Sequence, residues 1–288
     1  MSDWSSYFQS LTAELQSLTL LARLVVPHSV ARRVDLGARR ADNAAMPSPP
    51  TPRFALRQRD RQPELMDDPG LDPAAHRHAL AGLARLNRVS GSAAAVWPAV
   101  RRLALATPGR PVKVLDVATG SGDVLLDLMR KASRAGVALD AAGCDLSPVA
   151  VAAATDAASR AKVPARFFAA DVLRQPLPAG YDAVICSLFL HHLDRDAAVG
   201  LLGRMRAAGP RLIVVNDLAR SAFNYAVVWV GARLLSRSPV VHVDGPLSVR
   251  AAFTPAELLA VADDAGLAGA TVTPHFPGRM VLEWRAPS

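Results

Sequence analysis

The chain has 288 residues, of which 51% are hydrophobic and 20% are charged, and its formal net charge is +8. This length is sufficient for one large α/β domain with an appendage. Residues 1–63 contain nine arginines and five acidic residues, which supply half of the positive excess, so we interpret the charge as a basic tail and expect no specific nucleic-acid partner.

No apolar stretch reaches the length of a transmembrane helix, and the run 18–26, interrupted by Arg23, is a weak candidate for a signal peptide. The two cysteines, Cys144 and Cys186, fall at the ends of expected buried strands. This placement indicates small core residues of a cytoplasmic protein, with no disulfide and no metal site. The sequence leaves the oligomeric state open.

Three parts are expected along the chain. Residues 1–54 form an extension, in which leucines at helical spacing predict a marginal amphipathic helix and a proline-rich segment predicts a stiff linker. Residues 55–110 form a helical cap, in which Asp72 caps one helix and a second helix covers about 93–105. Residues 111–288 form the cofactor-binding domain.

The most informative segment is 114–123, with the sequence Val-Leu-Asp-Val-Ala-Thr-Gly-Ser-Gly-Asp. It predicts a buried strand that ends near Asp116, then a tight turn and the start of a helix. Gly120 and Gly122 allow the backbone to pass close to a ligand because they have no Cβ. Leu125 occupies the third glycine position of a dinucleotide fingerprint, and no Gly-Lys-Ser/Thr of a P-loop follows. An unliganded turn in another doubly wound fold remains the alternative.

Two more predicted strands follow, and each ends in an acidic residue. Asp145 lies 23 residues beyond Gly122, a spacing that suits a carboxylate accepting hydrogen bonds from both hydroxyls of a ribose. Ser147, which is followed by proline, predicts the N-cap and first turn of a helix. The next strand, over 166–172, contains Asp171 at its end. The order of these strand ends favours a nucleotide-like cofactor at one edge of a parallel sheet.

A covering segment is expected in the second half of the chain. The apolar stretch 223–235 carries Tyr225 and Trp229 four residues apart, and we expect this pair to cover an acceptor, with core packing as the alternative. Asp217 is expected to cap a helix. The other predicted elements are a strand near 181–187, a helix over 194–207, a strand over 211–215, a helix opened by the Thr254–Glu257 capping box, and a hairpin of 270–274 and 280–284.

The sequence of 116–123, Asp-Val-Ala-Thr-Gly-Ser-Gly-Asp, resembles motif I of the class I S-adenosylmethionine-dependent methyltransferases. It looks most like the ubiquinone and menaquinone biosynthesis C-methyltransferase branch, and residues 86–91 resemble the Asn-x-x-Ser segment that covers the cofactor there. The resemblance extends over about 75–285. It implies an α/β, Rossmann-like seven-stranded sheet with a C-terminal antiparallel hairpin and an N-terminal helical cap. It also implies S-adenosyl-L-methionine as cofactor, bound by Asp116, Ala118, Thr119, Gly120, Gly122, Asp145, Leu146, Asp171, Val172 and Ser187.

The class of acceptor is narrowed by motifs that the chain lacks. Residues 187–189, Ser-Leu-Phe, replace the Pro-Pro-aromatic run of amino-methylating DNA enzymes, and Ile185 precedes Cys186 where a base C5-methylating enzyme has Pro-Cys. No glutamate lies between Glu64 and Glu257 to form the glutamate pair of protein arginine methyltransferases. We therefore expect a small hydrophobic acceptor, phenolic or quinone- or polyketide-like as in secondary metabolism, methylated on oxygen or carbon.

His191 and His192 follow the fourth predicted strand, where the quinone branch typically has Phe-Gly-x-Arg-Asn. A histidine with an ordinary pKa of about 6.5 can serve as a general base, and His192 is our first choice and His191 our second. The alternative is that one contacts the cofactor backbone and the other packs as a satisfied polar residue. Two rival functions also remain: an RNA-directed methyltransferase, which needs an ordered basic face, and a non-catalytic cofactor-binding module, which the intact turn disfavours.

Overall fold

The computed structural model describes residues 56–68 and 70–287. The chain divides into a unit of residues 1–48 and a unit of residues 49–288, and all described residues belong to the second. The amphipathic helix and proline-rich linker expected within 1–54 lie outside the described residues. None of the described helices is long and apolar enough to cross a membrane.

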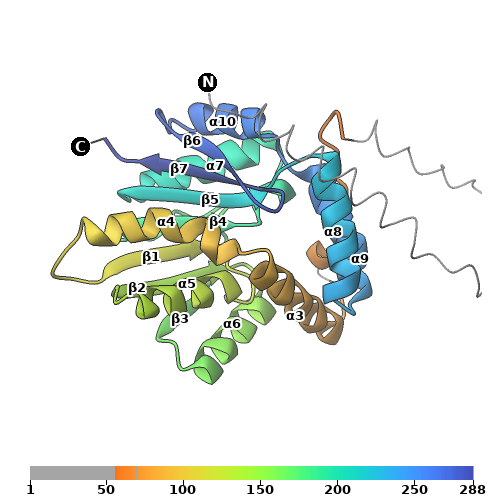
Figure 1. The fold of residues 1–288 in the computed structure, drawn as a ribbon, viewed down its shortest axis with the longest axis horizontal. Helices are drawn as coiled ribbons and strands as arrows, with labels where there is room; N and C mark the ends of the chain where they lie inside the picture. The colour runs from red at the N-terminus through yellow and green to blue at the C-terminus, as the bar shows by residue number, and fades with distance from the viewer. Residues whose placement is uncertain (1–55, 69, 288) are drawn as a thin grey trace, which may run out of the picture. The chain divides into compact units, whose positions relative to one another are not determined.

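A seven-stranded mixed sheet forms the centre of this unit (Figure 1). The strand order is β3-β2-β1-β4-β5-β7-β6; the first five strands are parallel, and β7 pairs antiparallel with both of its neighbours. The expected Rossmann-like sheet with a C-terminal antiparallel hairpin is therefore confirmed. The strands are β1 Val112–Val117, β2 Leu139–Asp145, β3 Ala165–Ala169, β4 Ala183–Ser187, β5 Leu212–Leu218, β6 Thr271–His275 and β7 Arg279–Arg285.

Helices cover both faces of the sheet, and their starts follow from local capping chemistry. Asp72, Ser147, Asp194 and Ser221 each accept a hydrogen bond from a backbone N–H of the first turn, and Thr254 forms the expected capping box. The α-helices are α3 Pro73–Val89, α4 Ser92–Leu105, α5 Asp123–Arg134, α6 Pro148–Ala161, α7 Arg195–Ala207, α8 Ala222–Leu235, α9 Pro239–Ala251 and α10 Pro255–Asp264. Two 3-10 helices are η1 Leu65–Asp67 and η2 Leu190–His192.

The hydrophobic core has two layers, one on each face of the sheet. Successive side chains of a strand point to opposite faces, so Val114 packs with α4 and α5 whereas Leu115 packs with α7 and α10. Every residue of β5 is buried, as expected for a central strand covered on both faces. Figure 1 shows α3, α8 and α9 gathered beyond one end of the strands, where they contact one another. This helical group roofs the candidate site.

Three sequence-based predictions require correction. β3 ends at Ala169, so Asp171 lies in the turn beyond the strand. β5 continues through Asp217 to Leu218, and the next helix is capped by Ser221, so Asp217 does not cap it. The helix α9 was not predicted, because two prolines and a glycine interrupt its apolar pattern.

Candidate functional site

A cavity of about 830 Å³ lies at the carboxyl ends of the parallel strands. Its floor is formed by residues that follow β1, β2 and β4, and its roof by residues of η1, α3, α8 and α9. The carboxyl edge of a parallel sheet is where open α/β folds bind ligands. The cavity is large enough for a cofactor together with a second small molecule.

The glycine turn after β1 opens toward this cavity. Gly120 has φ +55, and a Cβ placed on it would meet no atom within 4 Å, so the space above the backbone is free. Gly122 has φ +72, and a Cβ there would lie 2.8 Å from the ring of Phe167, so this glycine is required for close packing of the turn against β3. The two glycines therefore have different tasks, and only Gly120 lines the cavity.

Asp116 is a buried carboxylate with one unused oxygen. Its Oδ2 accepts a hydrogen bond of 2.6 Å from the Thr119 hydroxyl, while its Oδ1 has no partner among the described residues. Burial raises the pKa of Asp116 to about 7, with Asp123 and Asp145 adding to the effect. An unpaired buried carboxylate is costly, and a cationic or N–H-bearing ligand at Oδ1 would remove that cost.

Asp145 connects the second strand end to the glycine turn. Its Oδ2 accepts from the backbone N–H of Gly120 at 2.8 Å, and its Oδ1 accepts from the N–H of Ser147 at 2.9 Å. The next side chain, Leu146, is 68% exposed and lines the cavity as an apolar platform. These residues fit a ligand that combines a polar diol with a flat apolar group.

The structure brings together seven of the ten expected cofactor-binding residues around the cavity. These are Asp116, Ala118, Thr119, Gly120, Asp145, Leu146 and Ser187. Gly122 lies behind the turn. Asp171 accepts hydrogen bonds from the backbone of Leu173 and Arg174 in its own turn, and Val172 packs in the core, so neither lines the cavity.

Arg279 is a buried residue at the site that the sequence analysis missed. It lines the cavity, and its Nε and Nη1 have no hydrogen-bond partner among the described residues. Its Nη2 donates to Ser90, and Asn87 donates to Asp123 at the start of α5. Burial lowers the pKa of Arg279 to about 10, so the guanidinium is charged at neutral pH and can bind an anionic group. A charged residue directly before the apolar run 280–282 was the available signal.

His191 and Asp217 form a buried pair at the end of the neighbouring strands β4 and β5. His191 Nδ1 lies 2.6 Å from Asp217 Oδ1, and the backbone N–H of His191 donates to Oδ2 at 3.0 Å. Burial raises the pKa of Asp217, but the interactions with His191 outweigh it and leave that pKa below its usual value. Asp217 therefore fixes the orientation of the imidazole, and His191 also lines the cavity.

His192 has a different environment. Its Nδ1 lies 3.1 Å from Asp67 Oδ2, and its Nε2 lies 3.9 Å from Glu64 Oε2. Burial lowers the pKa of His192, but the hydrogen bond with Asp67 and the charges of Glu64 and Asp67 raise it to about 9. His192 thus carries a proton at neutral pH, which makes it a poor acceptor of a second one.

The roof helix α8 presents a different face from the one expected. Tyr225 packs in a cluster with Leu218, and Trp229 is 44% exposed with the Arg233 guanidinium 3.9 Å from its ring centre. Neither aromatic side chain lines the cavity, so the expectation that this pair covers an acceptor is wrong. The α8 residues that do line it are Asn224, Val227, Val228, Gly231 and Leu235.

Comparison with known proteins agrees with this geometry. A family model described as a methyltransferase domain matches residues 114–208. A demethylmenaquinone methyltransferase of Thermus thermophilus is 36% identical over 133 residues, which are 46% of this chain and 59% of that protein. An uncharacterized methyltransferase of Mycobacterium bovis is 31% identical over 135 residues, which are 44% of this chain and 67% of that protein.

Among solved structures, an O-methyltransferase from neocarzinostatin biosynthesis, in complex with S-adenosyl-L-homocysteine and 1,4-dihydroxy-2-naphthoic acid, has the same fold with a TM-score of 0.55. It is 20% identical, and the match covers 78% of this chain and 62% of that one. The chain thus spans less than two thirds of the Thermus relative and of this structure. On the match to the methyltransferase domain, the relatives and the seven-stranded sheet, the chain belongs to the class I S-adenosylmethionine-dependent methyltransferase family.

Proposed function

We propose that the chain transfers the methyl group of S-adenosyl-L-methionine to a small hydrophobic acceptor that is phenolic, quinone-like or polyketide-like. The observation that carries this proposal is a single cavity with two chemically different ends. One end presents the glycine turn and two acids, and the other presents apolar side chains beside an Asp-held histidine. A cofactor and an acceptor bound in one water-poor cavity are held in reach of each other.

The residues at the polar end fit S-adenosyl-L-methionine. Asp145, held by the turn, suits the ribose hydroxyls, and the free Oδ1 of Asp116 suits the amino group of the methionine part. Arg279 can bind its carboxylate through the unpartnered guanidinium nitrogens. When bound, the cofactor supplies a methyl group on a positively charged sulfur, which makes that methyl electrophilic.

The apolar end fits a hydrophobic acceptor. Its walls come from α3, α8 and α9, and they include Leu80, Leu83, Leu86, Val227, Val228 and Val241. Such walls bind an aromatic ring by removing apolar surface from water, at about 25 cal/mol per Å² buried. They also exclude water from the reacting atoms.

His191 is the better candidate for the general base, and His192 becomes the second. Asp217 accepts the Nδ1 proton of His191, which leaves Nε2 free to accept the proton of a phenolic hydroxyl. His192 is already protonated at neutral pH because its pKa is about 9. This reverses the order expected from the sequence, where the two rings could not be distinguished.

Two relatives named demethylmenaquinone methyltransferase support a quinone-like acceptor. The solved relative with 1,4-dihydroxy-2-naphthoic acid supports an acceptor with adjacent aromatic and hydroxyl groups. The rival RNA-directed function is disfavoured because seven acidic residues line the cavity: Glu64, Asp67, Asp68, Asp116, Asp123, Asp145 and Asp244. Carboxylates around a cavity make it unfavourable for a phosphate group. The buried free thiols Cys144 and Cys186 support a cytoplasmic location.

The proposal is tested by incubating the full chain with methyl-labelled S-adenosyl-L-methionine and 1,4-dihydroxy-2-naphthoic acid or a related naphthohydroquinone. Mass spectrometry of the product distinguishes methylation on oxygen from methylation on carbon. Label in a small aromatic product supports the proposal. Label in RNA that is added to a parallel incubation favours the first rival. Tight S-adenosylhomocysteine binding without transfer to any hydroxyaromatic compound favours the non-catalytic module.

A further inference from the structure

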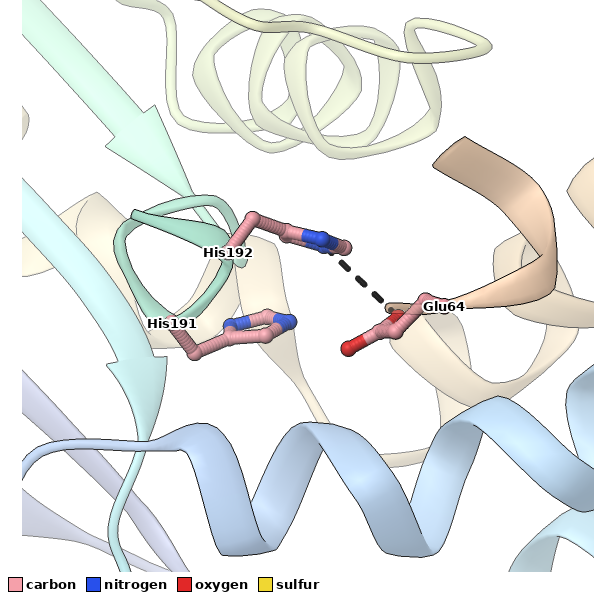
Figure 2. Close-up of side chains that lie close together, drawn as sticks. All are labelled: Glu64, His191 and His192. Atoms are coloured by element: carbon pink, nitrogen blue, oxygen red, sulfur yellow. Dashed lines mark ion pairs between the residues drawn. The ribbon is translucent and has the colours of Figure 1, made fainter. Parts of the chain in front are cut away.

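Three side chains from two distant parts of the chain meet at the acceptor end of the cavity. Figure 2 shows the rings of His191 and His192 and the carboxylate of Glu64 pointing toward one another. One nitrogen or oxygen of each side chain lies within 4.8 Å of those of the other two. His191 is 3% exposed and Glu64 is 8% exposed, so the cluster is not a chance grouping of surface charges.

Each of these side chains is held in place by a second polar group. His191 Nδ1 is bonded to Asp217 and His192 Nδ1 to Asp67, so the Nε2 atom of each ring is the one left for a ligand. Glu64 Oε1 accepts from the Ser248 hydroxyl at 2.8 Å. Histidines that ligate metals almost always have their other ring nitrogen bonded in this way, often to a carboxylate.

The loop that carries both histidines is fixed as well. Arg59 donates to the backbone oxygen of His191 and Arg61 to that of His192, each at 2.9 Å. The neighbouring guanidinium groups are therefore bonded to carbonyls of this loop. Among the described residues no arginine forms an ion pair with Glu64, so its carboxylate is available to a cation.

We propose that Glu64, His191 and His192 form a binding site for a divalent transition-metal ion. A histidine ligates a metal only in its neutral form, so the ion displaces the proton that His192 carries in the ion-free protein and binding releases that proton. Two imidazoles and one carboxylate are a ligand set of Zn²⁺, and a three-residue set leaves a coordination position open for water or a substrate oxygen. Mg²⁺ and Ca²⁺ prefer oxygen ligands, so a set with two imidazole nitrogens suits them less well.

The observed spacing is close to what an ion requires. Ligand atoms about 2.1 Å from a tetrahedral ion are about 3.4 Å from one another. His192 Nε2 and Glu64 Oε2 are 3.9 Å apart, and the widest separation in the cluster is at most 4.8 Å. Small side-chain rotations therefore bring the three atoms to bonding distance without movement of the backbone.

An ion at this place would face the acceptor end of the cavity. If the proposed methyl transfer is correct, an acceptor hydroxyl could bind at the open coordination position and lose its proton more readily there. The ion would then take over the task of activating the acceptor from the free His191 base. Ion binding itself does not depend on the proposed transfer.

The test uses the full chain freed of metal with a chelator and then titrated calorimetrically with Zn²⁺. Titration with Co²⁺, followed by visible absorption, reports the coordination of the ion. The variants Glu64→Gln and His192→Gln remove one ligand each, and Asp67→Asn removes only the group that orients His192. His78→Gln, an exposed histidine on α3, is the matched control for surface binding.

We expect the wild type to bind one ion tightly per chain. Binding should be at least tenfold weaker in Glu64→Gln and His192→Gln, and 10- to 100-fold weaker in Asp67→Asn. His78→Gln should bind the ion as the wild type does. Equal affinity in all four variants, or no stoichiometric site in the wild type, overturns the proposal. Circular dichroism and S-adenosylhomocysteine titration of the same samples show whether each variant is folded. Cofactor binding without metal binding refutes only the metal site, whereas failure to bind the cofactor refutes the proposed function.

Discussion

Replacement of Asp116 by asparagine is expected to change the pH dependence of folding in a calculable way. In the cofactor-free protein the pKa of Asp116 is about 7, against an ordinary value of 3.8, because burial disfavours the charged form. The folded chain therefore binds more protons than the unfolded chain between these two pH values. Raising the pH through this window destabilises the folded state.

The size of the effect follows from the two pKa values. Each pKa unit corresponds to about 1.36 kcal/mol, so the raised pKa of Asp116 costs the folded state about 2 kcal/mol at pH 5, where only the unfolded chain ionises this group, and about 4 kcal/mol at pH 8, where both states ionise it. Asparagine has no charge to bury. The free energy of unfolding of Asp116→Asn, relative to that of the wild type, should therefore increase by about 2–3 kcal/mol between pH 5 and pH 8.

Urea unfolding of both proteins at pH 5 and pH 8, without cofactor, measures this gain. Asp182→Asn is a matched control, because Asp182 has a pKa below 3.8 through its contact with Arg110 and is ionised in both states across this range. Its difference from wild type should not change between the two pH values. The result to compare is the free energy of unfolding of Asp116→Asn minus that of the wild type. If this difference is the same at both pH values, or smaller at pH 8, then Asp116 is not a carboxylate whose pKa is raised by burial.

Three further outcomes are expected. Gly120→Val weakens S-adenosylhomocysteine binding at least tenfold in calorimetry, because its side chain enters the cavity. Gly136→Val is the control: this glycine has a similar positive φ of +66 and equally open surroundings, and the variant keeps wild-type affinity. Asp217→Asn lowers kcat by about 10²- to 10⁴-fold with little change in cofactor affinity, because His191 loses the group that orients it. An equal loss of cofactor affinity would indicate that Asp217 has a structural role. A chain that begins at Phe54 keeps its fold and cofactor affinity, and aggregation of this shortened chain would show that the extension is an integral cover.

The polar end of the site could be predicted because its signals are local. The strand, glycine turn and helix around Gly120 form one continuous segment, 112–134, and local sequence preferences specify them. Asp145 follows the next strand, and the carboxyl ends of paired parallel strands meet at one edge. The positions of Asp116 and Asp145 were therefore predictable without knowledge of the tertiary contacts.

The acceptor end depends on contacts between distant segments. Glu64 lies in a short 3-10 region with no periodic pattern, so nothing in the sequence indicates that it reaches His192. Asp217 lies in β5, which pairs with β4, yet only the register of that pair brings it to His191. The pattern of α8 was clear, but its 3.6-residue period could not tell which face meets the cavity, which is why Trp229 was misplaced.

We expect the cavity to bind S-adenosylmethionine through the glycine turn and the acids around it. Calorimetric titration of the full chain with S-adenosylhomocysteine and with NAD, for the wild type and for Asp145→Ala, tests this expectation most directly. We expect one S-adenosylhomocysteine site per chain, weaker NAD binding, and a loss of about 1.5–3 kcal/mol of binding free energy in Asp145→Ala, because an ionic hydrogen-bond acceptor is removed. Wild-type affinity in the variant, or tighter binding of NAD, would contradict it.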